Sequence, residues 1–285
     1  MEINTKLPTP YSFNTIKEEI IIEMGIGGAG LKYEKKIYNN LLKASKNKLL
    51  AGKLSDVQSP NGNDCNKPDI TCNINGQNIN IEAKSKFDDP LGNFSIKHTL
   101  GEPDFDLSSE VLDYKDKEGL SSILAKKLDT IDKYINFARK QNPTSYNSQI
   151  KGFPMYISQE GADAAREAGL AKAIADYSTK DEFDINTVIG LYNNGKNTYY
   201  IQIGGYGLYC LGFDKYKLGV PELKGKCIVE IRPFASGTKK RKDPKTGKPV
   251  KVVSLGLRAS PRMVNIESKS KYTLDDVDSI IELLS

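Results

Sequence analysis

The chain has 285 residues, and 38% of them are hydrophobic, which is enough for the packed core of one large domain or two small ones. Lysine and arginine number 41 against 36 aspartates and glutamates, so the net charge of +5 is compatible with a polyanionic partner without requiring one. No run of about 18 apolar residues could span a bilayer, and no secretory signal is indicated. We therefore expect a soluble, cytoplasmic protein without membrane contacts.

Residues 1–24 are expected to form an amino-terminal arm, because their first part carries two prolines and no periodicity. The segment Gly25–Gly30 fits the GxGxxG pattern, follows an apolar run and opens a helix, as a dinucleotide-binding turn does. No second strand ending in an acid follows that helix, so a parallel βαβ unit is not indicated. We interpret the glycines as a turn that begins the helix; a nucleotide-dependent oxidoreductase is the alternative.

The segment Leu31–Leu42 is expected to be an amphipathic helix, because its apolar residues recur at helical spacing. Its apolar stripe consists of Leu31, Tyr38, Leu41 and Leu42, with Ile37 at the edge. Glu34 falls inside this stripe, where an ionisable side chain needs a partner. We expect Glu34 to face a functional site; the alternative is a glutamate that turns to solvent or pairs with a lysine.

Asn75-Gly76 stands between two runs of alternating apolar and polar residues, which is the strongest short-range signal of a β-hairpin with a type I′ turn. A two-residue loop fixes the register, so counting back from the turn places Asp69 opposite Glu82. Alternation sends one set of side chains to a core face: Ile70, Cys72, Ile74, Ile79, Ile81 and Ala83. Asp69, Glu82 and Lys84 project from the other face.

Two opposed carboxylates repel each other unless a cation lies between them, since directly paired residues hold their Cβ atoms about 5 Å apart. The carboxylates of Asp69 and Glu82, the backbone carbonyl of Ala83 and several waters would suit Mg²⁺, with Mn²⁺ as a substitute. Lys84 points into the same site, where its ammonium would orient a water or stabilise charge on a phosphate. The hairpin therefore predicts a metal site.

Pro68-Asp69, twelve intervening residues and then Glu82-Ala83-Lys84 resemble the signature of the PD-(D/E)xK nuclease superfamily, whose members share the restriction-endonuclease-like fold. The resemblance covers residues 25–160 and implies an α/β core, with a mixed sheet flanked by helices. It implies that Asp69 and Glu82 hold the catalytic Mg²⁺ and that Lys84 assists the hydrolytic water. Glu34 resembles the glutamate of the first helix that reaches the metal in many of these nucleases, often through water.

We place the nuclease core at residues 25–180 and an antiparallel β extension at 181–285, with a single domain as the alternative. The elements expected after the hairpin are a loop, a helix, a buried strand and a second helix, at 87–117, Leu120–Lys140, Phe153–Ser158 and Ala162–Tyr177. Helix, hairpin, helix and strand is thus the element order expected of the core.

Five strands separated by turn signals are expected in the extension, at Val188–Tyr192, Thr198–Ile203, Leu208–Gly212, Cys227–Arg232 and Val250–Leu257. A terminal amphipathic helix is expected to run to Leu284, with Thr273 as its N-cap.

A basic loop, residues 239–251, joins the last two of these strands and holds seven cations and one acid. A cationic loop at a hairpin tip follows a phosphate backbone by releasing counterions, which gives salt-dependent affinity without base specificity. The residues that we expect to contact DNA are Lys86, Lys239, Lys240, Arg241, Lys242, Lys245 and Lys248. Three arginines, Arg232, Arg258 and Arg262, lie near the base of this loop. The alternative is a solvated loop that aids solubility.

The four cysteines, Cys65, Cys72, Cys210 and Cys227, lack the paired short spacing of a zinc site and are too few for a disulfide framework. Reduced thiols are expected, with a Cys65–Cys72 bridge as the alternative. His98 is the only histidine, which excludes multi-histidine zinc sites. We interpret His98 as a surface or DNA-facing residue, with a catalytic role as the alternative.

Together these features predict a Mg²⁺-dependent endodeoxyribonuclease that hydrolyses DNA phosphodiester bonds, with sequence-specific, restriction-type cleavage favoured over structure-selective cleavage. No convincing Gln-x-x-x-Tyr motif follows the catalytic strand, which weakens an exonuclease assignment. A non-catalytic DNA-binding module of the same fold is the alternative. A homodimer is a further expectation, because cutting both strands with one such site per chain usually requires two chains.

Overall fold

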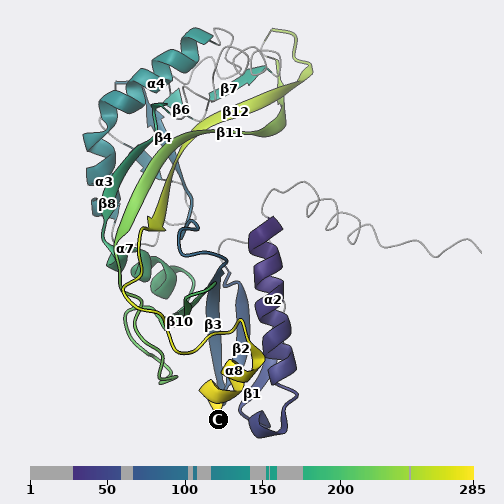
Figure 1. Cartoon of the computed structure of the whole chain (residues 1–285). Coiled ribbons are helices and arrows are strands. Elements are labelled where there is room, and N and C mark those ends of the chain that lie inside the picture. The colour runs from purple at the N-terminus through teal and green to yellow at the C-terminus, as the bar shows by residue number, and fades with distance from the viewer. Residues whose placement is uncertain are drawn as a thin grey trace, which may run out of the picture.

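The computed structural model describes residues 28–58, 67–101, 105–107, 117–141, 152–153, 155–158, 176–243 and 245–285. They form a mixed α/β structure with two β-sheets and several helices, and Figure 1 shows the two sheets one above the other. The arm expected at 1–24 and nearly all of the helix expected at Ala162–Tyr177 lie outside the described residues.

The first sheet contains five strands in the order β1 (Leu54–Gln58), β2 (Ile70–Ile74), β3 (Gln77–Lys84), β9 (Tyr200–Ile203) and β10 (Gly207–Cys210). Neighbouring strands are antiparallel, except that β3 and β9 are parallel. Helices α2 (Gly28–Ala44) and α8 (Val277–Leu284) share an apolar cluster with one face of this sheet. The sheet therefore takes strands from both 25–180 and 181–285.

The β2–β3 hairpin has the register that the Asn75-Gly76 turn predicts. The recorded pairs include Ile70 with Ile81, Cys72 with Ile79 and Ile74 with Gln77. Both turn residues have positive φ, 52° at Asn75 and 81° at Gly76, as a type I′ turn requires. All six side chains predicted for the core face are buried. Burial of one face stabilises this register, because a slip of one residue would turn those side chains to solvent.

Helix α2 confirms the helix expected at Leu31–Leu42 and extends it at both ends. Its buried apolar residues are Ile37, Leu41 and Ala44, whereas Leu31, Tyr38 and Leu42 stay partly exposed. The buried stripe is turned toward Ile37 relative to the prediction, because α2 contacts the sheet on one side and α8 on another. Glu34 lies one turn before Ile37 and so remains beside the buried stripe.

The second sheet is built on the path β5 (Phe105–Leu107), β4 (Phe94–Thr99), β12 (Pro249–Met263), β11 (Cys227–Lys242) and β8 (Thr179–Phe183). Two short strands complete it, β6 (Gly152–Phe153) beside β4 and β7 (Met155–Ser158) beside β12. Helices α3 (Lys117–Lys126) and α4 (Leu128–Gln141) pack on its apolar face. Along the first part of β11, buried and partly exposed residues alternate, so the other face carries the polar side chains.

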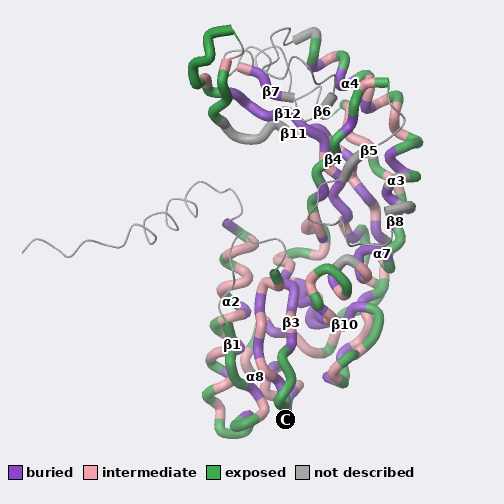
Figure 2. The backbone as a smooth tube through the Cα atoms, turned by 180° about the vertical axis from the view of Figure 1, so that it is seen from behind, coloured by how far each residue is buried: buried purple, intermediate pink, exposed green. Residues whose placement is uncertain are grey.

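Strands β9 and β10 join the two layers, because every residue in both is buried. Ile201 and Ile203 belong to the apolar cluster of the second sheet, whereas Tyr200 and Leu208 belong to that of the first. Figure 2 shows buried stretches running along the strands of both sheets. Glu82 pairs with Ile201, and paired residues share a face, so the Glu82 side chain points toward the apolar cluster of the second sheet.

Two predictions about the middle of the chain were wrong in part. The helix expected at Leu120–Lys140 is two helices, α3 and α4, with a break at Lys127. Apolar residues on both sides of the break face the same core, so their spacing did not reveal it. The strand expected at Phe153–Ser158 is divided between β6 and β7, which join the second sheet, whereas the parallel neighbour of β3 is β9.

The strand expected at Val188–Tyr192 is wrong, because this segment is helical. Helix α7 (Ile185–Gly190) is followed by η3 (Leu191–Gly195), a π-helical turn. A short apolar run suits a buried strand and a buried helix equally, and packing against the apolar cluster of the second sheet decides between them. The strands expected at Thr198–Ile203 and Leu208–Gly212 are confirmed as β9 and β10.

Three further boundaries differ from the predictions. The loop expected at 87–117 contains β4 and β5, which lie at one side of the second sheet. Strands β11 and β12 are longer than expected, because they pair with each other almost to the tip of their hairpin. The N-cap of α8 is Asp276 rather than Thr273, since its side chain accepts a hydrogen bond from the Ser279 amide at 3.1 Å.

Candidate functional site

Three of the predicted site residues meet at the carboxyl end of β3. Asp69 Oδ2 accepts a hydrogen bond from the backbone N–H of Ala83 at 2.8 Å. Glu82 is only 2% exposed, and Lys84 Nζ donates to its Oε1 at 2.9 Å. The β2–β3 ladder ends with Ile70 opposite Ile81, and its register, continued by one residue, sets Asp69 opposite Glu82. The hairpin thus brings both acids and the lysine to one place.

A second lysine at this site, Lys196, was missed by sequence reasoning. Lys196 Nζ donates to the other carboxylate oxygen of Glu82, Oε2, at 3.0 Å. It follows η3, whose Tyr192 donates a hydrogen bond from its buried hydroxyl to the carbonyl of Leu91. Neither Tyr192 nor Lys196 belongs to a recognisable motif. A strand was predicted at Val188–Tyr192, which ends before Lys196. A π-helical turn often marks a functional site, but it cannot be recognised from sequence.

Glu34 of α2 interacts electrostatically with the same cluster. Burial raises the pKa of its carboxyl above the ordinary value, and the negative charge of Glu82 adds to this, whereas Lys84 and Lys196 act to lower it. The structure therefore brings Asp69, Glu82 and Lys84 together and places Glu34 of α2 within electrostatic range of them.

The pKa values of the two hairpin acids are shifted in opposite directions. Burial raises the pKa of Asp69 to about 7, and the charges of Glu82 and Glu34 add to this effect. Burial also acts to raise the pKa of Glu82, but the ammonium groups of Lys84 and Lys196 outweigh it and hold that pKa below its ordinary value. Burial alone would lower the pKa of Lys84, but the Glu82 carboxylate holds it well above the usual range. Glu82 and Lys84 are therefore both charged at neutral pH, whereas Asp69 titrates there.

The donor set of this cluster fits a hard divalent cation. Asp69 and Glu82 supply carboxylate oxygens, which Mg²⁺ prefers. The N–H and C=O of one strand residue point to the same neighbour, so the Ala83 carbonyl lies on the Asp69 side, as its N–H does. Burial, followed by the charge of Glu82, raises the pKa of Asp69, and a bound cation would offset both effects.

Two observations limit this fit. Both carboxylate oxygens of Glu82 are paired with lysines, so a cation would have to compete with Lys84 and Lys196. Within the described parts of the chain, no three His, Cys, Asp or Glu side chains are already grouped as metal ligands. The acids of the cluster would therefore have to move closer together around an ion.

The predicted DNA-binding residues lie at two separate places. Lys86 is exposed and follows β3 by two residues, beside the acid cluster in the chain. The others surround the tip of the β11–β12 hairpin, which Figure 1 shows at the end of the second sheet away from β3. The exposed cations there are Lys240, Arg241, Lys242, Lys245 and Lys248. Nothing is described of the Lys239 side chain.

Much of the predicted basic loop at 239–251 is strand. Its ends belong to β11 and β12, where Lys240 pairs with Lys251 and Lys242 with Pro249. The guanidinium of Arg241 stacks on the ring of Tyr156, 4.3 Å from its centroid. Pairing therefore presents the cations from a two-stranded ribbon with a short turn, instead of from a long flexible loop.

The prediction that His98 faces the surface or DNA is wrong. His98 is 3% exposed on β4, and its Nε2 lies 2.9 Å from Oδ1 of Asp132 on α4. Its ring stacks on Phe105, with centroids 4.5 Å apart. Strand alternation places His98 on the face that α4 covers, so it links a strand to a helix away from the acid cluster.

The remaining cysteine and glycine predictions have simple outcomes. Cys72, Cys210 and Cys227 are free, buried thiols, while Cys65 lies outside the described residues. Gly28 and Gly30 lie in the first turn of α2, and the strand that follows, β1, runs antiparallel to β2. A dinucleotide-binding unit requires the strands before and after its helix to be parallel, and the segment before α2 lies outside the described residues. The described geometry therefore does not test the oxidoreductase alternative.

Gln202 and Tyr206 do have the Gln-x-x-x-Tyr spacing, but Gln202 lies on a strand. Its buried amide donates to Tyr33 and Thr273 and accepts from the Leu274 amide. Because Gln202 pairs with Ala83, its side chain lies on the face that α2 covers, opposite to that of Glu82. This pair does not extend the acid cluster.

Comparisons with protein-family models, with curated proteins and with solved structures found no match to this chain. Among the helices described here, none combines the length and the apolar character needed to cross a membrane. The interpretation of the site therefore depends on its own residues.

Proposed function

We propose that this protein is a Mg²⁺-dependent endodeoxyribonuclease of the PD-(D/E)xK type, which cuts DNA in a sequence-specific, restriction-type mode in preference to a structure-selective one. The observation that carries the proposal is the meeting of Asp69, Glu82 and Lys84 at the end of β3, with Glu34 from α2 beside them. The five-stranded mixed sheet, with α2 and α8 packed on one face, is compatible with a restriction-endonuclease-like core, although the helix and strand expected after the hairpin belong to the layer of the second sheet.

In this proposal the oxygen donors hold the metal. Asp69, Glu82 and the carbonyl of Ala83 would be ligands of Mg²⁺, and Glu34 would support it through water. The bound ion would polarise the phosphate and lower the pKa of the attacking water. Mn²⁺ would substitute, because it accepts the same oxygen ligands.

The lysines would act as fixed positive charges. Because Glu82 holds the pKa of Lys84 well above the usual range, Lys84 keeps its proton and cannot act as a general base at neutral pH. Its ammonium would instead orient the attacking water and stabilise negative charge on the phosphate. Lys196 would add a second cation on the opposite carboxylate oxygen of Glu82.

A non-catalytic DNA-binding module is the second candidate, and one observation favours it. The two lysines already pair with both oxygens of Glu82, so the charge of this buried carboxylate is balanced without a metal. Such a module would bind DNA through its basic residues and leave phosphodiester bonds intact.

Cleavage assays with supercoiled, linear and branched DNA, with Mg²⁺ and with EDTA, test the proposal. We expect Mg²⁺-dependent cutting by the wild type, which Asp69→Asn and Lys84→Ala each reduce by about 100-fold or more. The matched control is Lys224→Ala, because Lys224 pairs with Glu222 at the same two-residue spacing but at the surface. This control should cut as the wild type does.

Each other outcome of these assays has a defined meaning. Cutting by Asp69→Asn and Lys84→Ala at the wild-type rate would refute the assigned site. If the wild type and all variants bind DNA but do not cut it, with Mg²⁺ or with Mn²⁺, the non-catalytic DNA-binding module would be favoured. Cutting of branched DNA alone would replace the restriction-type mode with the structure-selective one. The molar mass of the cutting species in solution tests the homodimer that double-strand cleavage requires.

A further inference from the structure

A second charged cluster lies on the face of the second sheet opposite to α3 and α4. The β11–β12 register pairs Arg232 with Arg258 and Ile228 with Arg262. Alternation along each strand places these three arginines on one face. Glu230, which pairs with Ser260, lies on the same face between the two pairs that contain the arginines. The side chains of Arg232 and Arg262 are 31% and 25% exposed, so this face is accessible to solvent. We call these three residues the arginine cluster.

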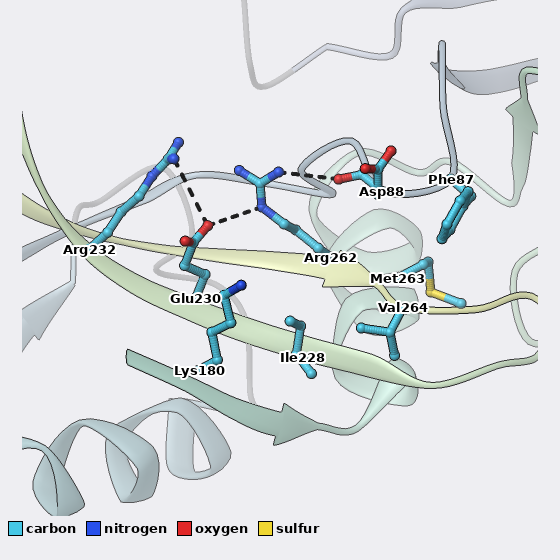
Figure 3. A pocket seen from close by; sticks show the side chains of 9 residues that line it. All are labelled: Phe87, Asp88, Lys180, Ile228, Glu230, Arg232, Arg262, Met263 and Val264. Atoms are coloured by element: carbon cyan, nitrogen blue, oxygen red, sulfur yellow. Dashed lines mark hydrogen bonds and ion pairs between the residues drawn. The ribbon is translucent and has the colours of Figure 1, made fainter. Parts of the chain in front are cut away.

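The arginine cluster is short of negative partners. Arg262 Nε lies 3.3 Å from Oε2 of Glu230, and an Arg232 Nη lies 3.9 Å from the same oxygen. Figure 3 shows the two guanidiniums on either side of this one carboxylate. Arg258 has no ion pair within the described residues, and its guanidinium stacks on the Phe234 ring at 4.9 Å.

Two further observations indicate that the arginine cluster favours a bound anion. Burial lowers the pKa of Arg258, and the like charges of Arg232 and Arg262 lower it further. The Nε atoms of Arg232 and Arg258 are buried without a hydrogen-bond partner in the described structure. Unpaired buried donors cost free energy, and an oxyanion is the group that satisfies several guanidinium donors at once.

A pocket of about 480 Å³ opens beside these arginines, lined by residues that include Lys180, Glu230, Arg232 and Arg262 (Figure 3). The floor comes from β8, β11 and β12, and one side comes from the segment that follows β3. Arg262 Nη1 donates to the carbonyl of Asp88 at 3.2 Å, which fixes that segment against the cluster. Glu230 and Asp88 are the acids of the lining, against three cations.

Chain connectivity places the arginine cluster near the acid cluster. Lys84 belongs to the acid cluster, and Asp88, four residues later, contacts Arg262. Four residues span at most about 14 Å between the Cα atoms of Lys84 and Asp88. Arg262, at one end of the arginine cluster, therefore contacts the segment that leaves the acid cluster.

We propose that the arginine cluster binds the phosphodiester backbone of nucleic acid on the same strand that reaches the acid cluster. Its charge suits a polyanion, its planar guanidiniums suit the bidentate geometry of phosphate, and its position suits a strand that continues from the acid cluster. The identity of the polyanion as DNA rests on the proposed function. The cluster reads no base, so its contribution to binding is independent of sequence.

Fluorescence anisotropy with a short labelled DNA duplex tests the inference in EDTA, where cleavage plays no part. Arg232→Gln, Arg258→Gln and Arg262→Gln should each weaken binding by roughly tenfold and lower the slope of log affinity against log salt by about one. The matched control is Arg139→Gln, because Arg139 is exposed on α4 behind the opposite face of the sheet. It should leave affinity and slope unchanged. Arg258→Lys keeps the charge and should retain most of the salt dependence.

Equal affinity and slope for the wild type and all three glutamine variants would overturn the inference. A glutamine variant could lose binding because it is unfolded, which thermal melting would show. In that case the inference would be overturned if the folded Arg258→Lys variant bound DNA no better than the glutamine variants. Binding of millimolar inorganic phosphate that the substitutions abolish, with duplex binding unaffected by them, would reassign the cluster to a small anion. Failure of DNA cleavage together with arginine-dependent binding would refute the proposed nuclease and leave this inference standing.

Discussion

The two charged clusters are built in opposite ways. In the acid cluster, each oxygen of the buried Glu82 is paired with a lysine, and burial, with the charges of Glu82 and Glu34 added to it, raises the pKa of Asp69. In the arginine cluster, Arg232 and Arg262 share the single carboxylate of Glu230, and burial, with the charges of these two arginines added to it, lowers the pKa of Arg258. The first cluster therefore favours a cation and the second an anion. A metal ion and a phosphate backbone are complementary to this pair.

The largest effect is expected from replacing Glu82, because its carboxylate balances the positive charges of two lysines. Glu82→Gln removes the carboxylate and leaves two poorly solvated ammoniums without it, so it should destabilise the fold by about 3 kcal/mol. Glu222→Gln, at an exposed ion pair, should change stability by about 0.5 kcal/mol or less. Urea unfolding of both variants measures the difference. Equal stabilities would show that the lysines are not held by Glu82.

Replacing Lys196 should slow DNA cleavage less than replacing Lys84 does. Tertiary packing places Lys196 on the other carboxylate oxygen of Glu82, Oε2, where it is the second of two cations. Lys196→Ala is expected to slow DNA cleavage by roughly tenfold, as the loss of one of two stabilising cations would. Lys180→Ala, in the pocket beside the arginine cluster, should leave the rate at saturating DNA unchanged. Single-turnover kinetics distinguish the two. A rate for Lys196→Ala equal to that of the wild type would remove Lys196 from the active site.

The pH dependence of stability separates the two acids of the hairpin. The folded pKa of Asp69 is raised to about 7 from 3.8, so between these values the folded state binds more protons at this residue than the unfolded state. Its contribution to stability is therefore greatest below pH 4 and declines as the pH rises toward 7, by at most about 1.4 kcal/mol per pH unit. Asp69→Asn should remove this decline in metal-free unfolding curves measured from pH 5 to 7. An unchanged slope would contradict the buried position of the carboxyl.

The hairpin tip should show the smallest effect on catalysis, because it lies away from β3. Replacing Lys240, Arg241 and Lys242 by alanine should weaken DNA binding by a few-fold for all sequences and flatten its salt dependence. The cleavage rate at saturating DNA should stay at the wild-type value. Filter binding over a salt series measures the first effect. A salt dependence identical to that of the wild type would place the tip outside the interface.

Sequence predicted the parts of the site that local geometry determines. The Asn75-Gly76 turn fixes a register over fewer than ten residues on either side, so Asp69 and Glu82 could be paired without knowledge of the fold. The placement of Glu34 beside the buried stripe of α2 also followed from helical spacing. These inferences needed only one strand pair and one helix.

Long-range packing determines the rest, and sequence reasoning failed there. Lys196 reaches Glu82 only because β9 lies parallel to β3, although Ile201 follows its partner Glu82 by 119 residues in the chain. The apolar run before Lys196 suited a strand as well as a helix, and packing selected the helix. His98 was misplaced for a related reason, because its strand could not be recognised within an apparent loop. The arginines could be found near each other in sequence, but their shared face required the register of β11 and β12.

If Asp69 and Glu82 hold a divalent cation, calorimetric titration with Mg²⁺ detects its binding without reference to cleavage. We expect one Mg²⁺ site in the wild type and in Glu222→Gln, and no such site in Asp69→Asn. Binding to Asp69→Asn with wild-type affinity, or no binding to the wild type, would contradict this assignment.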